Sequence, residues 1–311
     1  MKTKILVAGI GGVGGFIGAK LAKYSETNND LEIYFLCRGK NLEKILSDGL
    51  ELIEPEGTCL VKPFMAADNC NAFPKMDAVI IACKSYDLES LCDTISNSVS
   101  EQTIIMPLLN GISHSEVLKR KFPNSILCAA FIYIVSKLEA PAQILMESKS
   151  HSVYFGHIES NTERLFELEK LLKEAHINAF CVDNIEENIW RKFTFISPIA
   201  TYTSAYNLTK KEIVENVEHS KALKAMMYEV YTLSKAMKIK LAEDIVEQHW
   251  QQFLKLPDGS SSSMHRDYTL GKASEIETLS EFVVKESQNL GLKTPFYNIA
   301  IEQIGKTKYN Q

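Results

Sequence analysis

Near its start the chain carries the stretch Lys4-Ile5-Leu6-Val7-Ala8-Gly9-Ile10-Gly11-Gly12-Val13-Gly14. Residues 4–8 predict a buried strand, and a helix-compatible segment follows from Val13 to Tyr24. The six residues that follow the strand and lead into this helix, Gly9, Ile10, Gly11, Gly12, Val13 and Gly14, match the pattern G-x-G-x-x-G. Such glycines permit a tight turn, close approach of the backbone to a pyrophosphate and close packing of the helix, whose free N–H groups face the phosphates. The strand and helix that flank the pattern favour a dinucleotide site over an ordinary glycine turn.

Further apolar runs predict a sheet around this first strand. They lie at Leu31–Cys37, Asp77–Cys83, Thr103–Leu109 and Ser125–Ile132. Because each run is apolar almost without interruption, we expect parallel strands covered on both faces. More amphipathic strands are predicted at Gln143–Glu147, Ser152–Phe155 and Ala179–Val182, with a helix at Thr162–Ala175.

The strand pattern ends near Asn184. Beyond it, apolar residues recur at spacings of three and four, which predicts helices: Leu223, Met226, Met227, Val230, Leu233 and Met237. We therefore expect an α/β Rossmann-type amino-terminal domain with a mainly parallel sheet, residues 1–183, followed by an all-helical carboxyl-terminal domain, residues 184–311.

Composition narrows the class of partner. The 311 residues carry a formal net charge of -5, which argues against a nucleic acid or an anionic membrane as partner. The seven cysteines are scattered and form no C-x-x-C pair, so neither a disulfide framework nor a zinc site is predicted. The histidines also lack metal-ligand spacing. We expect a cytoplasmic protein that acts on a small molecule without a metal and does not enter a membrane, and a homodimer remains an alternative to the monomer.

The second predicted strand ends on a cation. A fold that binds a ribose 2′-hydroxyl usually places Asp or Glu there, whereas this chain has Cys37 and then Arg38. Arg38 suits a 2′-phosphate and hence NADPH/NADP; the alternative is a solvated turn residue. Lys84 and Asn110 follow two other predicted strands, so they share the carboxyl edge where ligands bind, although each is also an ordinary residue for an exposed turn.

Several short motifs, in this order and spacing, resemble the ketopantoate reductase family (2-dehydropantoate 2-reductases). They are the loop at Gly9, Arg38, Lys84-Ser85-Tyr86, Asn110-Gly111, Trp190-Arg191-Lys192, Ser262-Ser263-Met264 with Asp267, and Gly271 with Glu275-Ile276. The resemblance covers nearly the whole chain. It implies NADPH-dependent reduction of a 2-oxo acid to the 2-hydroxy acid, in the first place 2-dehydropantoate to pantoate in pantothenate and coenzyme A synthesis. It also implies that the helical domain closes over the substrate.

The resemblance assigns roles to individual residues. Arg38 and Lys84 resemble the pair that meets the adenosine phosphate of the cofactor, and Asn110 the residue near the nicotinamide and the substrate. Lys192 resembles the proton donor. Ser263 resembles a substrate contact, and Glu275 an acidic catalytic residue near the cofactor and the lysine.

The residue types agree with these roles. Hydride transfer to a ketone builds negative charge on its oxygen, which the ammonium of Lys192 can stabilise and protonate. Desolvation would lower the pKa of Lys192, and a carboxylate such as Glu275 would raise it.

The chain departs from the family four and eight residues after the lysine. Family members often carry asparagines there that contact the substrate, whereas this chain has Ile196 and Ala200. A hydroxyacid dehydrogenase for another 2-oxo acid, or a regulator that binds NADP(H) without catalysis, is therefore an alternative. Pro198, between the two positions, predicts a kink in the helix or its end.

Overall fold

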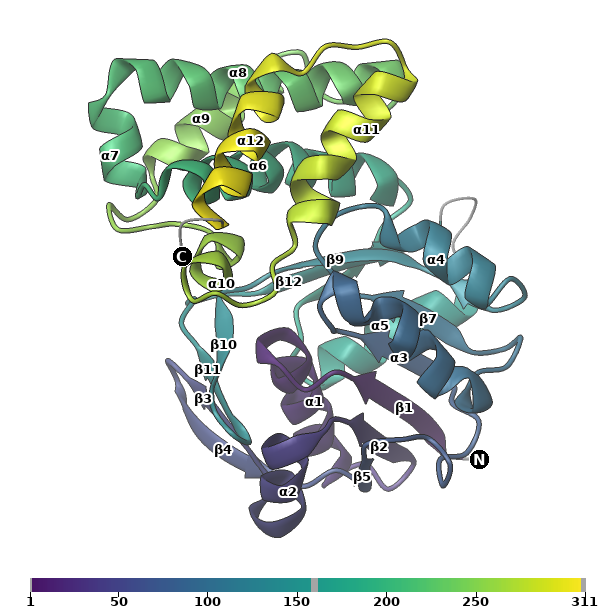
Figure 1. The fold of residues 1–311 in the computed structure, drawn as a ribbon. Helices are drawn as coiled ribbons and strands as arrows, with labels where there is room; N and C mark the ends of the chain where they lie inside the picture. The colour runs from purple at the N-terminus through teal and green to yellow at the C-terminus, as the bar shows by residue number, and fades with distance from the viewer. Residues whose placement is uncertain (1, 158–161, 309–311) are drawn as a thin grey trace. The chain divides into compact units, whose positions relative to one another are not determined.

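The computed structural model describes residues 2–157 and 162–308, which form two compact units (Figure 1). Unit 1 comprises Met1–Leu109 and His114–Ile185, and unit 2 comprises Asn110–Ser113 and Glu186–Gln311. The segment Asn110–Ser113 thus groups with the helical unit, although it directly follows residues of the unit 1 sheet region.

Unit 1 is built on a parallel sheet of six strands in the order β5-β2-β1-β6-β7-β8. Along this sheet the chain order is the one typical of Rossmann folds, with the first strand at the centre and the next strands added on either side. The central register pairs Val7 with both Phe35 and Ile80, so the loops after β1, β2 and β6 leave one edge together. The predicted fold class is confirmed. The strands are β1 (Thr3–Ala8), β2 (Leu31–Leu36), β5 (Met65–Ala67), β6 (Ala78–Ile81), β7 (Ile104–Pro107) and β8 (Ile126–Leu127).

Both faces of this sheet are buried. Ile5 and Val7 join one apolar cluster, which includes residues of α1 (Gly12–Ser25), α2 (Gly39–Asp48) and α5 (Glu163–Glu174). The alternate residues Leu6 and Ala8 join another cluster, with α3 (Leu88–Ile95) and α4 (His114–Lys121). Successive side chains of a strand point to opposite faces, so two buried faces explain why the strand sequences are apolar without alternation.

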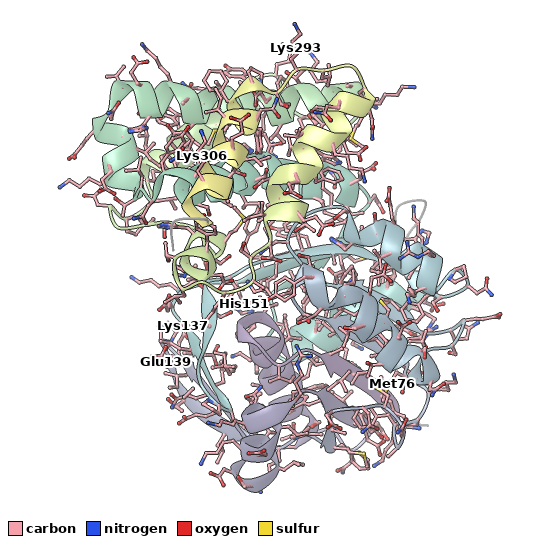
Figure 2. The ribbon with its side chains drawn as sticks, viewed as in Figure 1. Met76, Lys137, Glu139, His151, Lys293 and Lys306 are labelled. Atoms are coloured by element: carbon pink, nitrogen blue, oxygen red, sulfur yellow. The ribbon has the colours of Figure 1, made fainter. Side chains whose placement is uncertain are left out.

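Two smaller sheets extend unit 1. One has the order β10-β11-β3-β4, from β3 (Leu50–Glu54), β4 (Gly57–Val61), β10 (Ser136–Ala140) and β11 (Gln143–Met146). The other has the order β13-β12-β9, from β9 (Ala129–Tyr133), β12 (Ser152–Gly156) and β13 (Ala179–Cys181). The edge strand β10 carries the charged residues Lys137 and Glu139, whose ammonium and carboxylate groups lie 2.7 Å apart (Figure 2). Charged side chains on an edge strand discourage pairing with another chain.

Some strand predictions are wrong. The single strand expected at Ser125–Ile132 is two strands in two sheets, since the chain leaves the parallel sheet after Leu127 and enters the β9 sheet at Ala129. Strands β3, β4 and β5 were not predicted. Their burial is uneven, so they lack the continuous apolar run that identifies the central strands.

The regular elements of unit 2 within residues 186–308 are all helical. Its elements are α6 (Ile185–Tyr206), α7 (Lys210–Glu215), α8 (Val217–Ala236), α9 (Ile245–Leu254), α10 (Ser263–Thr269), the π-helical turn η3 (Glu277–Glu281), α11 (Phe282–Asn289) and α12 (Pro295–Lys308). The predicted apolar stripe from Leu223 to Leu233 is buried on α8, whereas Met237 is exposed. Helix α6 does not end at Pro198 but continues to Tyr206, because tertiary packing of the surrounding apolar residues outweighs the local penalty of proline.

The described residues have three further features. All seven cysteines are free thiols. Within residues 2–157 and 162–308, no helix combines the length and apolar character that a membrane crossing needs. The same ranges contain no group of three or more His, Cys, Asp or Glu residues arranged to hold a metal ion.

Candidate functional site

The glycine loop after β1 depends on the absence of side chains. Gly9 has a φ of 97°, and a Cβ there would lie 2.9 Å from the carbonyl oxygen of Ala82. A Cβ on Gly14 would lie 1.9 Å from the carbonyl oxygen of Gly9. These two glycines therefore allow β1, β6 and α1 to approach one another closely.

Gly11 leaves room for a ligand. It is the N-cap of α1, and no heavy atom lies within 4 Å of the position that a Cβ would take. Free N–H groups at the helix start and open space beside the backbone fit a phosphate group, so the loop fits the pyrophosphate of a dinucleotide.

Gly12 makes a contact that the sequence did not predict. A Cβ on Gly12 would lie 2.5 Å from the carbonyl oxygen of Ser136, so the start of β10 packs directly on the loop. No sequence signal links two backbone segments so far apart in the chain.

Arg38 and the turn after Lys84 lie at the same edge of the sheet. Arg38 is the N-cap of α2, and its guanidinium is 3.2 Å from the carboxylate of Asp87. Asp87 ends the short helix η1 (Ser85–Asp87), whose N-cap is Lys84. The side chain of Arg38 is 80% exposed, so it is accessible to an incoming phosphate with Asp87 as a competitor. Burial raises the pKa of the neighbouring Cys37 to about 12, which keeps that thiol protonated.

Lys192 is a buried cation in unit 2. It lies on α6 between Trp190 and Phe193, which are also buried, and only 8% of it is exposed. Its Nζ donates to the amide oxygen of Asn110 at 3.3 Å. Burial lowers the pKa of Lys192 to about 8, while the carboxylate of Glu275 acts in the opposite direction. An ammonium with this pKa can lose and regain a proton near neutral pH.

The segments of Asn110 and Glu275 meet within unit 2. Gly111 has a φ of 85°, and a Cβ on it would lie 3.2 Å from the carbonyl oxygen of Thr278, so the turn after Asn110 packs against η3. Glu275 stands just before η3, is 3% exposed, and its carbonyl accepts from the N–H of Leu279 at 3.0 Å. Unit 2 therefore brings together three predicted site residues that are far apart in the sequence.

Ser263 lies on α10 (Ser263–Thr269), whose start contacts α6 at another point than Lys192. It begins α10, whose N-cap Ser262 accepts from the N–H of His265 at 3.0 Å. The hydroxyl of Ser262 also lies 3.1 Å from that of Thr203, which is about three helical turns beyond Lys192. Asn207, past the end of α6, is engaged with His265 at 2.8 Å.

Apolar residues occupy the positions four and eight residues after Lys192 on α6. Ile196 is half-buried and packs with the apolar core of unit 2, and Ala200 is buried. Since residues four apart share a helix face, Ile196 follows Lys192 on one side of α6 without adding a polar group.

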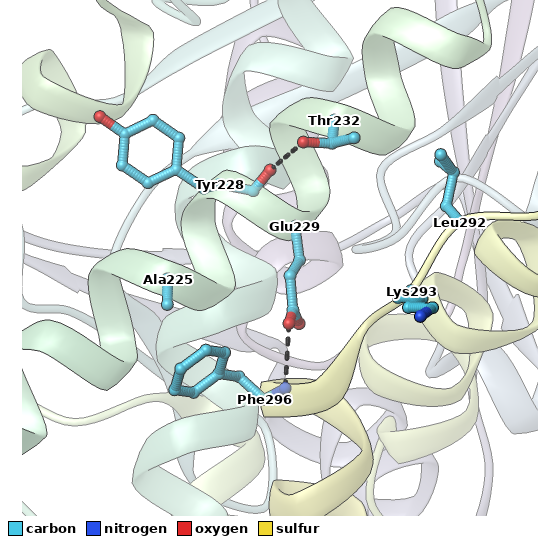
Figure 3. Close-up of a pocket in the computed structure, with 7 residues that line it drawn as sticks. All are labelled: Ala225, Tyr228, Glu229, Thr232, Leu292, Lys293 and Phe296. Carbon is cyan, nitrogen blue, oxygen red and sulfur yellow. Dashed lines mark hydrogen bonds between the residues drawn. The ribbon is translucent and has the colours of Figure 1, made fainter.

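A surface cavity of unit 2 lies away from these residues (Figure 3). It lies between α8 and the start of α12, and its lining includes none of the predicted site residues. Glu229 in this cavity accepts the N–H groups of Phe296 and Tyr297, at 2.9 and 3.1 Å, and so caps α12. The cavity is lined by Ala225, Tyr228, Glu229, Thr232, Leu292, Lys293 and Phe296.

Comparison with protein families decides the assignment. The family model described as ketopantoate reductase PanE/ApbA matches residues 5–160, and the model of the C-terminal part of ketopantoate reductase PanE/ApbA matches residues 184–308. The chain belongs to the ketopantoate reductase family. The resemblance read from the motifs is thereby confirmed.

Curated relatives match over nearly their whole length. The protein described as "uncharacterized oxidoreductase YkpB" of Bacillus subtilis (strain 168) is 28% identical, with 94% of each chain covered. The 2-dehydropantoate 2-reductase of Streptococcus pyogenes serotype M3 is 23% identical, with 96% of each chain covered.

Solved structures of other proteins share the fold. That of 2-dehydropantoate 2-reductase from Porphyromonas gingivalis W83 has a TM-score of 0.86 at 28% identity and covers 98% of this chain and 99% of its own. A D-mandelate dehydrogenase, solved with NADH and anilino(oxo)acetate, has a TM-score of 0.88 at 20% identity and covers 99% of both chains, a likeness that concerns the fold alone.

Membership of the ketopantoate reductase family defines the general activity. The protein is an NADP-dependent oxidoreductase that binds a nicotinamide cofactor and reduces a 2-oxo acid, a small-molecule substrate. This result favours catalysis over the alternative of a regulator that only binds the cofactor.

Proposed function

We propose that the protein reduces 2-dehydropantoate (ketopantoate) to pantoate with NADPH in the cytoplasm, as a step of pantothenate and coenzyme A synthesis. Residues 1–183 bind the dinucleotide, and residues 184–311 bind and protonate the substrate. The observation that carries the proposal is the buried ammonium of Lys192 beside Asn110, under the influence of the Glu275 carboxylate, in a chain of this family.

In this proposal, residues at the carboxyl edge of the parallel sheet bind the cofactor. The backbone from Gly9 to Gly14 would hold the pyrophosphate, since Gly11 leaves open space at the start of α1. Arg38 and Lys84 would hold the 2′-phosphate, and Arg38 is exposed enough to exchange Asp87 for it. When bound, NADPH supplies the hydride.

The proton comes from Lys192 in this proposal. Negative charge develops on the carbonyl oxygen during reduction, and the Nζ of Lys192 stabilises it and then donates a proton. Glu275 favours the charged form of Lys192 before the reaction. Asn110 accepts from Nζ through its amide oxygen, which orients the ammonium and leaves the amide nitrogen to donate to the substrate or the nicotinamide.

A second candidate substrate is a 2-oxo acid with a purely apolar side chain. Ile196 and Ala200 offer no hydrogen bond at the two positions that follow Lys192 on α6. If the substrate is ketopantoate instead, Ser263 is the residue that would contact its 4-hydroxyl group. Without this contact the 4-hydroxyl group would go unrecognised.

The test follows the loss of NADPH with ketopantoate, 3-methyl-2-oxobutanoate, pyruvate and phenylpyruvate as substrates. The highest kcat/KM is expected for ketopantoate. A clear preference for 3-methyl-2-oxobutanoate or phenylpyruvate would establish the second candidate instead. Tight binding of NADPH without reduction of any of these acids would contradict the proposed function.

A further inference from the structure

Helix α6 and the turn η3 are joined by buried hydroxyl groups. Ser197 and Thr201 lie on α6, Ser280 lies in η3, and all three are fully buried. The Oγ of Ser197 donates to the carbonyl oxygen of Leu279 at 2.5 Å, and the Oγ1 of Thr201 lies 2.8 Å from the Oγ of Ser280. Buried hydroxyls cost free energy unless they are hydrogen-bonded, so these contacts tie the two elements together in one arrangement.

Tyr297 completes the connection. Its hydroxyl lies 2.5 Å from the Oγ of Ser197, and because Ser197 donates its own hydrogen to Leu279, Tyr297 is the donor. Burial raises the pKa of Tyr297, which keeps that hydrogen in place.

Helix α8 in turn holds Tyr297 in position. The carboxylate of Glu229 accepts the N–H groups of Phe296 and Tyr297, and Figure 3 shows the bond to Phe296. The start of α12 is thereby capped, and the Tyr297 ring is fully buried. The hydroxyl of Tyr297 is therefore presented to Ser197 from a fixed helix terminus.

The turn η3 offers an unusual acceptor. It is π-helical, a rare geometry that occurs mostly as a single turn inside an α-helix. Leu279 lies in this turn, and its carbonyl takes the hydrogen of Ser197. The side chain of one helix therefore stabilises the irregular backbone of another.

Both ends of this connection lead to the site. Ser197 lies five residues after Lys192 on α6, and Leu279 lies four residues after Glu275. The N–H of Leu279 donates to the carbonyl of Glu275 at 3.0 Å, so the position of Leu279 determines that of the Glu275 backbone.

We propose that Ser197 and Tyr297 are positioning residues that set the separation between the Glu275 carboxylate and the Lys192 ammonium. The inference rests on the proposed roles of Lys192 and Glu275. The interaction between two charges falls with distance and is strongest where water is excluded, as it is around these buried groups. A small displacement of η3 is therefore enough to change how readily Lys192 holds its proton.

The predicted consequence concerns the pH dependence of reduction. Within unit 2, Glu275 faces Lys192 from the segment before η3, and Asn110 faces it from the turn after Leu109, whereas the adjacent Arg191 is exposed. If Glu275 moves away, the pKa of Lys192 falls, because burial continues to disfavour the charged form. The activity should then decline at a lower pH than in the unaltered protein.

The experiment measures kcat/KM for 2-oxo acid reduction against pH in Ser197→Ala, Tyr297→Phe and the double variant. Tyr297→Phe keeps the ring and so the packing, which makes it the decisive variant. Its alkaline limb is expected to move down by about half a pH unit, a change of about threefold in the proton affinity of Lys192. The double variant should shift no further than Ser197→Ala, because both substitutions break one chain of hydrogen bonds.

Ser287→Ala is the matched control. Ser287 lies on α11, is fully buried, and its hydroxyl has no hydrogen-bond partner among the described residues, so its removal should leave the pH profile unchanged. An unshifted limb in Tyr297→Phe, or an equal shift in Ser287→Ala, would overturn the inference. If Lys192→Ala retained full activity, the proposed roles of Lys192 and Glu275 would be contradicted. If Lys192→Ala were inactive but the alkaline limb of Tyr297→Phe did not move, only the positioning role of Ser197 and Tyr297 would be contradicted.

Discussion

The glycine loop of unit 1 and the Lys192 cluster of unit 2 are built in opposite ways. The loop is six consecutive residues, and its geometry depends on side chains that are absent: a Cβ on Gly14 would lie 1.9 Å from the oxygen of Gly9. The cluster consists of the side chains of Asn110, Lys192 and Glu275, which come from three segments. The hydrogen bond from Lys192 Nζ to Asn110 Oδ1 joins residues 82 positions apart. A local backbone requirement leaves a pattern in the sequence, whereas an assembly of distant side chains needs the whole helical fold.

The two regions also use positive charge differently. Arg38 has a side chain that is 80% exposed and pairs with Asp87, so its guanidinium can exchange one anion for another. Lys192 is 8% exposed and its pKa is lowered to about 8. An exposed guanidinium suits binding of a phosphate, and a buried amine suits transfer of a proton.

The largest effect is expected from the loop glycines. Gly14→Ala forces a Cβ against the backbone of Gly9, so we expect loss of measurable NADPH binding together with a lower melting temperature. Gly11→Ala is the matched variant, because its Cβ meets no protein atom within 4 Å. It should keep the melting temperature and weaken NADPH binding about tenfold or more by occupying the phosphate space. Unchanged NADPH affinity in Gly11→Ala would contradict the assignment of the pyrophosphate to this loop.

The next effect concerns the choice of cofactor. Arg38→Ala removes the charge-assisted contact to a 2′-phosphate, so NADPH affinity should fall about 10- to 100-fold while NADH affinity stays constant. Fluorescence titration with both cofactors measures the ratio. Arg120→Ala serves as control, since Arg120 is an exposed arginine of α4 paired with Glu89. Equal losses for NADPH and NADH would contradict the assignment of Arg38.

A smaller effect is expected on the pH profile of reduction. In the proposed mechanism the proton donor is charged Lys192, so the rate should fall as the pH rises through the Lys192 pKa of about 8. Glu275 raises that pKa, and Glu275→Gln should therefore move the decline to lower pH. Glu277→Gln changes an exposed carboxylate of η3 and should leave the profile in place. A decline that moved to higher pH in Glu275→Gln would refute the electrostatic role of Glu275.

The smallest effect is expected on NADPH binding from the substitution of Asp87 in unit 1. Asp87 competes with a phosphate for Arg38, and an exposed ion pair of this kind is weak. Asp87→Asn should thus strengthen NADPH binding about two- to threefold, measured by titration at low salt. Weaker binding in this variant would mean that Asp87 orients Arg38 rather than competes for it.

The elements that the sequence predicted well have local causes. The central strands are apolar because both faces are buried, and Leu223 to Leu233 recur with the helical period because α8 buries one stripe. Arg38 and Lys84 could be placed at one edge because parallel strands end together.

The elements that the sequence did not predict have distant causes. The contact of Gly12 with Ser136, the change of sheet at Cys128 and the bond from Ser197 to Leu279 each join segments without a shared period. The continuation of α6 through Pro198 depends on the packing of unit 2, which the local penalty of proline does not reveal. The assembly of Asn110, Lys192 and Glu275 was accessible only through the family resemblance.

The most direct test of the account measures NADPH affinity and single-turnover reduction of a 2-oxo acid on the same sample of Lys192→Ala. The account predicts unchanged NADPH affinity and a rate lowered about 100- to 10,000-fold, the usual contribution of a positioned proton donor. Lys221→Ala, which removes an exposed lysine of α8, should leave both quantities unchanged. A rate in Lys192→Ala within a few-fold of the unaltered protein would contradict the assignment of cofactor binding to one region and proton donation to the other.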